Sequence, residues 1–146
     1  MKRKQVYRGI NLGDIFLLPI PTKEKRHYFI VIGILQNNKK CLLTSFSSVK
    51  HDDSYKGRYW DKSCIISEKD NICFLSGKPL LKCESYIRYQ KTIEMNYSDL
   101  LRLKNTMFFL GHVGFSPLHR IIKGAQETPE IDASLKIMYN ISGYSR

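Results

Sequence analysis

Three apolar runs joined by short connections constrain the fold of this chain more than any other feature of its sequence. The runs span residues 14–20, 28–35 and 41–46. The second is a nearly continuous series of aromatic and β-branched residues, which is typical of a strand buried on both faces. Parallel strands need a crossover of a dozen or more residues, and these connections are too short for one. The sequence therefore predicts an antiparallel meander rather than βαβ units.

The remainder of the chain first continues as short strands and then becomes helical. A brief strand is expected at residues 64–66, a loop at 70–84 and a fifth strand at 86–91. Ser98 can cap a helix over residues 99–110, because leucines, Met and Phe recur there at helical spacing. Two further helices are predicted, one from Ser116-Pro117 to Gly124 and one over residues 132–139. At 146 residues we expect one α+β domain, a strongly bent sheet followed by helices that cover it.

The net charge of +11 is concentrated in the first part of the chain. Residues 1–60 hold 12 lysines and arginines against 4 acidic residues, whereas residues 61–100 hold 6 of each. A basic surface favours an anionic partner such as nucleic acid or an acidic protein. A charge that serves only solubility explains the same numbers, so charge alone leaves both interpretations open.

A cationic segment, Lys23 to His27, stands directly before the second apolar run. It is either a solvated hairpin turn or a phosphate-binding site at the mouth of a strand. Histidine titrates near neutral pH and serves as a general base or acid, and arginine offers a planar fork of donors for phosphate oxygens. A hydroxyl at the end of the neighbouring strand, such as that of Ser47, could donate to the same oxygens.

The order of these features resembles the MazF/PemK family of toxin endoribonucleases. The resemblance is carried by Gly13-Asp14 before an apolar strand, by His27-Tyr28 opening the second strand, and by Ser85-Tyr86 in the fifth. It implies a small SH3-like antiparallel β-barrel over residues 13–95, with a helical C-terminal extension over residues 96–146 packed on it.

The resemblance also implies catalytic residues for metal-independent cleavage of single-stranded RNA. The family has a catalytic arginine in an Arg-Pro pair before the second strand, where this chain has His27-Tyr28 with Arg26 one position earlier and no proline. The family's second catalytic position, a threonine at the end of the third strand, aligns with Ser47. Arg26, His27 and Ser47 are therefore the predicted catalytic residues, with His51 as the alternative base and with no metal or cofactor expected.

RNA contacts are expected mainly from the loop after the third strand, because unpaired bases stack on aromatic rings while lysine and arginine follow the phosphates. Trp60 is equally well explained as a core or dimer residue. The predicted RNA-binding residues are Lys25, Ser48, Lys50, His51, Tyr55, Arg58, Tyr59, Trp60 and Arg88. The family further implies a homodimer, and an antitoxin protein whose acidic segment occupies the RNA site.

Two other functions remain open from the sequence: a non-catalytic nucleic-acid-binding module, and a toxin of the same fold that acts on a protein target. Fold alone does not decide between them. The four cysteines lack metal-knuckle spacing and are expected to be buried thiols. No secretion signal or membrane-spanning run is recognisable, so we expect a cytoplasmic protein without a membrane partner.

Overall fold

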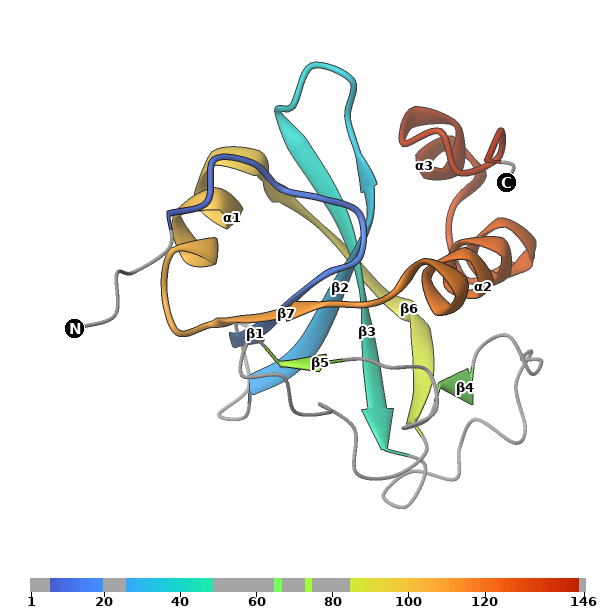
Figure 1. Cartoon of the computed structure of the whole chain (residues 1–146). Helices are drawn as coiled ribbons and strands as arrows, with labels where there is room; N and C mark the ends of the chain where they lie inside the picture. The colour runs from blue at the N-terminus through green and yellow to red at the C-terminus, as the bar shows by residue number, and fades with distance from the viewer. Residues whose placement is uncertain (1–5, 20–25, 49–64, 67–72, 75–84, 145–146) are drawn as a thin grey trace.

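The protein is built around one antiparallel β-sheet, seen here in a computed structural model (Figure 1). The structure describes residues 6–19, 26–48, 65–66, 73–74 and 85–144. Within these ranges the sheet has seven strands in the spatial order β4-β6-β3-β2-β1-β7-β5. The strands are β1 Asp14–Pro19, β2 Arg26–Ile34, β3 Lys40–Ser48, β4 Ile65–Ile66, β5 Cys73–Phe74, β6 Ser85–Asn96 and β7 Phe109–His112. The helices are α1 Tyr97–Lys104, α2 Phe115–Glu127 and α3 Ala133–Met138.

The predicted meander is confirmed by the pairing of β1, β2 and β3 in chain order. Phe16 of β1 lies opposite Phe29 of β2, which lies opposite Ser45 of β3. The turn between β2 and β3 is built by two asparagines. Asn38 adopts the left-handed conformation, with φ of 55°, and the Asn37 side chain accepts a hydrogen bond from the Lys39 amide at 3.1 Å. Asparagine tolerates both roles, which is why this polar segment turns the chain tightly.

Strand β2 is buried on both faces, as its apolar run predicts. Ile30 and Ile32 pack on one side of the sheet, and Phe29 and Val31 on the other. The first side is covered by α2 and its cluster includes α2 residues such as Ile121. The second side is covered by α1 and the N-terminal segment, which contribute residues such as Leu100 and Ile10. The sheet is therefore the middle layer between two hydrophobic cores.

The predicted SH3-like barrel is wrong, because the sheet is open. Its two outer strands, β4 and β5, are two residues long, and among the described residues they pair with β6 and β7, respectively, at opposite ends of the strand order. A barrel requires its first and last strands to bond to each other, and this order has no such pair. The protein is an α+β fold with five longer antiparallel strands and helices on both faces.

The segment predicted as a helix over residues 99–110 divides into a helix and a strand. Helix α1 starts earlier, at Tyr97 with Asn96 as its N-cap, and it ends at Lys104. The chain then returns as β7, which pairs with β1. Phe109 is buried there with its ring centroid 5.4 Å from that of Phe16. The C-terminal part of the chain is therefore not purely helical, since it supplies one of the longer strands of the sheet.

The two last helices are confirmed, with α2 longer than predicted. The Tyr89 hydroxyl on β6 donates to the Ile121 carbonyl at 2.6 Å and fixes α2 to the sheet. Lys136 of α3 donates to the carbonyls of Gln126 and Thr128 at 3.1 and 2.6 Å, which satisfies backbone acceptors at the end of α2. In the part of the chain described here, no helix combines the length and apolar character needed to cross a membrane.

Candidate functional site

The predicted catalytic residues lie at one end of the sheet. Arg26 and His27 open β2 and pair with Pro19 and Leu18 at the end of β1. Ser47 is next to last in β3, and the β2–β3 register places Tyr28 opposite Phe46, one step from both His27 and Ser47. The start of β2 and the end of β3 thus lie side by side, and they bring together three residues that are up to 21 positions apart in the sequence.

Of the three predicted catalytic residues, His27 is the one whose side chain the structure describes. It is half-buried and lies on the same side of the sheet as its partner Leu18 and as Phe29, two residues further along β2. Arg26, Ser47 and Ser48 are placed by their backbones, with Ser47 and Ser48 opposite Tyr86 and Ser85 of β6. The other predicted RNA-binding residues, apart from Arg88, lie outside the described residues: Lys25, Lys50, His51, Tyr55, Arg58, Tyr59 and Trp60.

Arg88, predicted to contact phosphate, lies on β6 directly opposite Ser45 of β3. Among the described residues, Ser45 Oγ and Arg88 Nε are the buried side-chain atoms without a hydrogen-bond partner. Ser45 is 1% exposed, and leaving such a donor unsatisfied costs free energy. Both groups lack an acceptor and both lie on the His27 side of the sheet, since Ser45 also pairs with Phe29. Sequence reasoning missed Ser45, because only the strand register brings it opposite an arginine.

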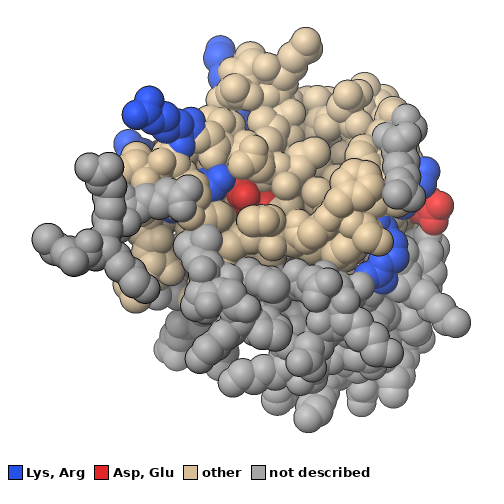
Figure 2. Space-filling view, viewed as in Figure 1, with Lys and Arg blue, Asp and Glu red and all other residues tan. Residues whose placement is uncertain are grey.

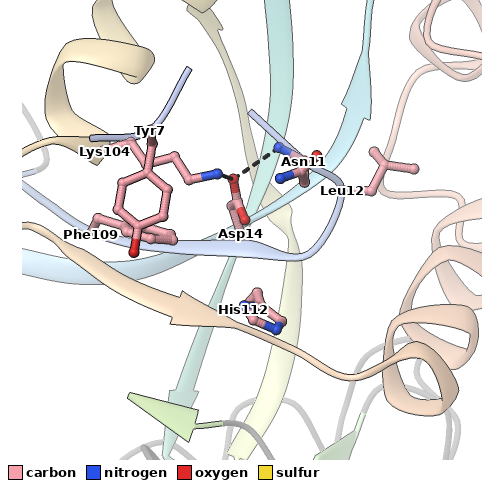
Figure 3. A pocket seen from close by; sticks show the side chains of 7 residues that line it. All are labelled: Tyr7, Asn11, Leu12, Asp14, Lys104, Phe109 and His112. Carbon is pink, nitrogen blue, oxygen red and sulfur yellow. Dashed lines mark hydrogen bonds and ion pairs between the residues drawn. The ribbon is translucent and has the colours of Figure 1, made fainter. Parts of the chain in front are cut away.

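A second group of polar residues lines a cavity of about 580 Å³ at the other end of β1 (Figure 3). The cavity lies between the N-terminal segment, β1, the end of α1 and β7. Its lining residues are Tyr7, Asn11, Leu12, Asp14, Lys104, Phe109 and His112. Its size falls within the range of small-molecule sites, roughly 300–1,000 Å³.

A buried ion pair forms one wall of this cavity. Lys104 Nζ lies 2.7 Å from Asp14 Oδ2, and the two side chains are only 3% and 2% exposed. The same carboxylate oxygen accepts the Asn11 amide at 2.9 Å, and Lys104 also donates to the Gly9 carbonyl at 2.8 Å. The ammonium lies 5.0 Å from the centres of the Tyr7 and Phe109 rings, within the range of cation–π attraction. These contacts compensate two charges that would otherwise be costly to bury.

His112 lies directly opposite Asp14 in the β1–β7 pairing and is exposed at the cavity. The cavity thus joins a carboxylate, an ammonium and an imidazole to aromatic walls. Sequence patterns assign no function to His112, and Asp14 enters only as part of the Gly13-Asp14 pair. One signal for Lys104 was available: it follows the core residue Leu100 by four positions, so it lies on the buried face of α1.

In the described part of the chain, Lys104 is the lysine that lines this cavity, and it is paired with Asp14. Figure 2 shows most of the lysines and arginines of the described residues near the edge of the visible face, and one blue area further in that adjoins a red one. A small acidic area lies near the centre of that face. The cavity therefore differs in character from the cationic strand end that the sequence predicts.

Cys41 is buried and unbridged, as expected for a thiol in an apolar run. Burial raises its pKa to about 11, and the negative charge of Asp14 acts in the same direction. The thiol is therefore protonated at neutral pH and is a poor nucleophile. Cys64 and Cys83 lie outside the described residues, and Cys73 is placed by its backbone in β5.

Comparison with known proteins adds no assignment to either site. No protein-family model matches the chain, and no curated protein matches its sequence at a significant level. Within the described ranges, no group of three or more His, Cys, Asp or Glu side chains is arranged to hold a metal ion. The chemistry of the two sites has to be inferred from their own residues.

Proposed function

We propose that this protein is a metal-independent endoribonuclease that cleaves single-stranded RNA and acts in the cytoplasm as the toxin of a toxin–antitoxin pair. The observation that supports it best is the strand register. Arg26, His27 and Ser47, predicted from the family resemblance and their chemistry, lie at adjacent ends of two neighbouring strands. A nuclease of this type needs an acid–base group, a cation and a hydroxyl close to one phosphate.

In the proposed reaction His27 takes the proton of the RNA 2′-hydroxyl. The 2′-oxygen then forms a bond to the adjacent phosphorus, the bond from phosphorus to the 5′-oxygen breaks, and a protonated donor returns a proton to that oxygen. The products are a 2′,3′-cyclic phosphate and a free 5′-hydroxyl. The guanidinium of Arg26 and the hydroxyl of Ser47 stabilise the extra negative charge on the phosphorane, where such groups contribute most.

Two further properties support RNA as the substrate. The chain carries a net charge of +11, with most of the excess in the residues that include this strand end. Arg88 Nε, on the same side of the sheet as His27, is a buried donor that lacks an acceptor among the described residues. A phosphate oxygen would supply one, and arginine binds phosphate through charge-assisted hydrogen bonds.

The proposal is tested by incubating purified protein with a long single-stranded RNA in the presence of EDTA. We expect discrete fragments ending in cyclic phosphate, and a rate that falls by about 10²–10⁴-fold in His27→Ala. The matched control is His119→Gln, because His119 lies on α2 and hydrogen-bonds Tyr144 at 3.2 Å, away from this strand end. Both variants are first compared with the parent by thermal unfolding.

Three results would change the assignment. Salt-sensitive RNA binding without cleavage would identify a non-catalytic binding module, since a cationic groove binds by releasing counterions. Growth inhibition by a protein that neither cleaves nor binds RNA would favour a protein target. Full cleavage by folded His27→Ala would remove His27 from the mechanism and make His51 the candidate base.

A further inference from the structure

One carboxylate oxygen of Asp14 can accept a further hydrogen bond at the cavity. Asp14 Oδ2 receives both Lys104 Nζ and the Asn11 amide, whereas Oδ1 has no hydrogen-bond partner among the described residues. A carboxylate oxygen can accept more than one hydrogen bond, so Oδ1 is a strong acceptor at the cavity wall. Figure 3 shows the Asp14 carboxylate in the middle of the lining residues, with the second oxygen turned away from Lys104.

The other lining residues indicate the charge, shape and polarity of a ligand that would fit the cavity. The Asp14 and Lys104 charges neutralise each other within the pair, so the cavity does not call for a charged group. Tyr7 and Phe109 line one side with aromatic rings, and Leu12, 40% exposed, lines the other with its side chain directed away from Asp14 (Figure 3). His112 adds a ring nitrogen at the rim. An uncharged, planar, partly apolar group with an N–H donor fits this combination.

We propose that the cavity binds an unpaired nucleobase that carries an exocyclic amino group, with that group donating to Asp14 Oδ1. Adenine, cytosine and guanine have such a group. Uracil has a ring N3–H instead, flanked by two carbonyl oxygens that the carboxylate would repel, so the site discriminates against uracil. Uracil would present a carbonyl oxygen where the amino group donates, and hydrogen bonds to charged groups are worth more than neutral ones. This inference rests on the proposed function for its RNA substrate, but nucleoside binding can be measured without cleavage.

The position of the cavity is consistent with one bound strand reaching both sites. Asp14 and Leu18 are four residues apart on β1, and Leu18 pairs with His27. At roughly 3.3 Å per residue, Asp14 lies about 13 Å along the sheet from the His27 pair. Asp14, Phe16 and Leu18 alternate onto the same side of β1, which is also the side of His27. Phe16 and Leu18 between them are buried under α1 and the N-terminal segment, so an RNA strand that reaches both sites would have to pass over these elements and not along the sheet.

The first experiment is a titration of ¹⁵N-labelled protein with free nucleosides, followed by two-dimensional NMR. With cytidine, adenosine and guanosine we expect the amides of Asn11 and His112 to shift while those of α3 stay constant. Cytidine and uridine form the most closely matched pair, because they differ only in the group at C4 and the proton on N3. We expect uridine to bind at least about tenfold more weakly than cytidine. Equal shifts with both, or none with any nucleoside at about 10 mM, would overturn the proposal.

The second experiment blocks the cavity without touching the ion pair. Leu12→Trp places a large ring at the exposed rim, and Ile137→Trp, on the 71% exposed Ile137 of α3, is the matched control. We expect Leu12→Trp to lose nucleoside shifts and to alter which RNA sequences are cleaved, whereas Ile137→Trp retains both. Unchanged nucleoside shifts in folded Leu12→Trp would overturn the proposal. Nucleoside binding by a protein that cleaves no RNA would refute the proposed function and leave the base site supported.

Discussion

Lys104 is the residue whose replacement most directly tests how this fold is held together. It is the last residue of α1, and its ammonium is buried against Asp14, the Gly9 carbonyl and two aromatic rings. Lys104→Met keeps a side chain of similar length and removes the charge. The carboxylate of Asp14, 2% exposed in the parent, would then keep the Asn11 amide as its remaining described hydrogen-bond donor.

The expected cost follows from that uncompensated charge. Removing one partner of a buried pair typically destabilises a protein by about 3–5 kcal/mol, because the other charge stays desolvated. Total stabilities are about 5–15 kcal/mol, so the variant should retain a folded population but lose a large share of its stability. At about 2 kcal/mol per molar urea, the unfolding midpoint should fall by roughly 1.5–2.5 M.

The assay is urea unfolding followed by far-UV circular dichroism, with Arg102→Met as the matched control on the same helix. Arg102 pairs with Asp99 at the surface, with side chains 78% and 45% exposed. Exposed pairs of this kind contribute about 0–1 kcal/mol, so the control midpoint should hardly move.

A double variant separates the charge from the packing of the lysine stem. Asp14→Asn retains a side-chain oxygen for the Asn11 amide and removes the negative charge. Asp14→Asn combined with Lys104→Met should therefore cost less than the two single changes added together. If Lys104→Met costs no more than Arg102→Met, then Asp14 is solvated through the cavity and the pair does not hold α1 to the sheet.

Two further predictions concern other parts of the fold. A Cβ on Gly33 would lie 2.8 Å from Tyr139 Cβ, so Gly33→Ala should push the segment after α3 off the sheet and cost about 1–3 kcal/mol; an unchanged thermal unfolding midpoint would contradict this. The pKa of Cys41 is raised from 9.0 to about 11 in the folded state, so its neutral thiol favours folding below pH 9 and this contribution is lost as pH rises from 9 to 11. Over that interval the free energy of unfolding should fall less steeply in Cys41→Ala than in the parent; parallel curves would show that the thiol does not take part.

The sequence by itself determined the parts of this protein that depend on neighbouring residues. The β1–β2–β3 meander follows from three apolar runs and short polar connections, because strands so close in the chain can pair only antiparallel. Burial of β2 on both faces follows from its continuous apolar run. The last two helices follow from a proline near one start and from apolar residues at helical spacing. Residue chemistry also selected His27 and Arg88 as candidates, and their roles remain predictions.

Tertiary structure decided that the sheet stays open, that residues 109–112 form a strand, and where the cavity lies. The segment 109–112 is apolar enough for a helix or a strand, and its conformation is set by pairing with β1, almost 100 residues earlier in the chain. The same pairing brings His112 opposite Asp14 and lets the end of α1 bury Lys104 against that carboxylate. Local patterns do not record such contacts, because their energy depends on which distant strands meet and on the burial that results.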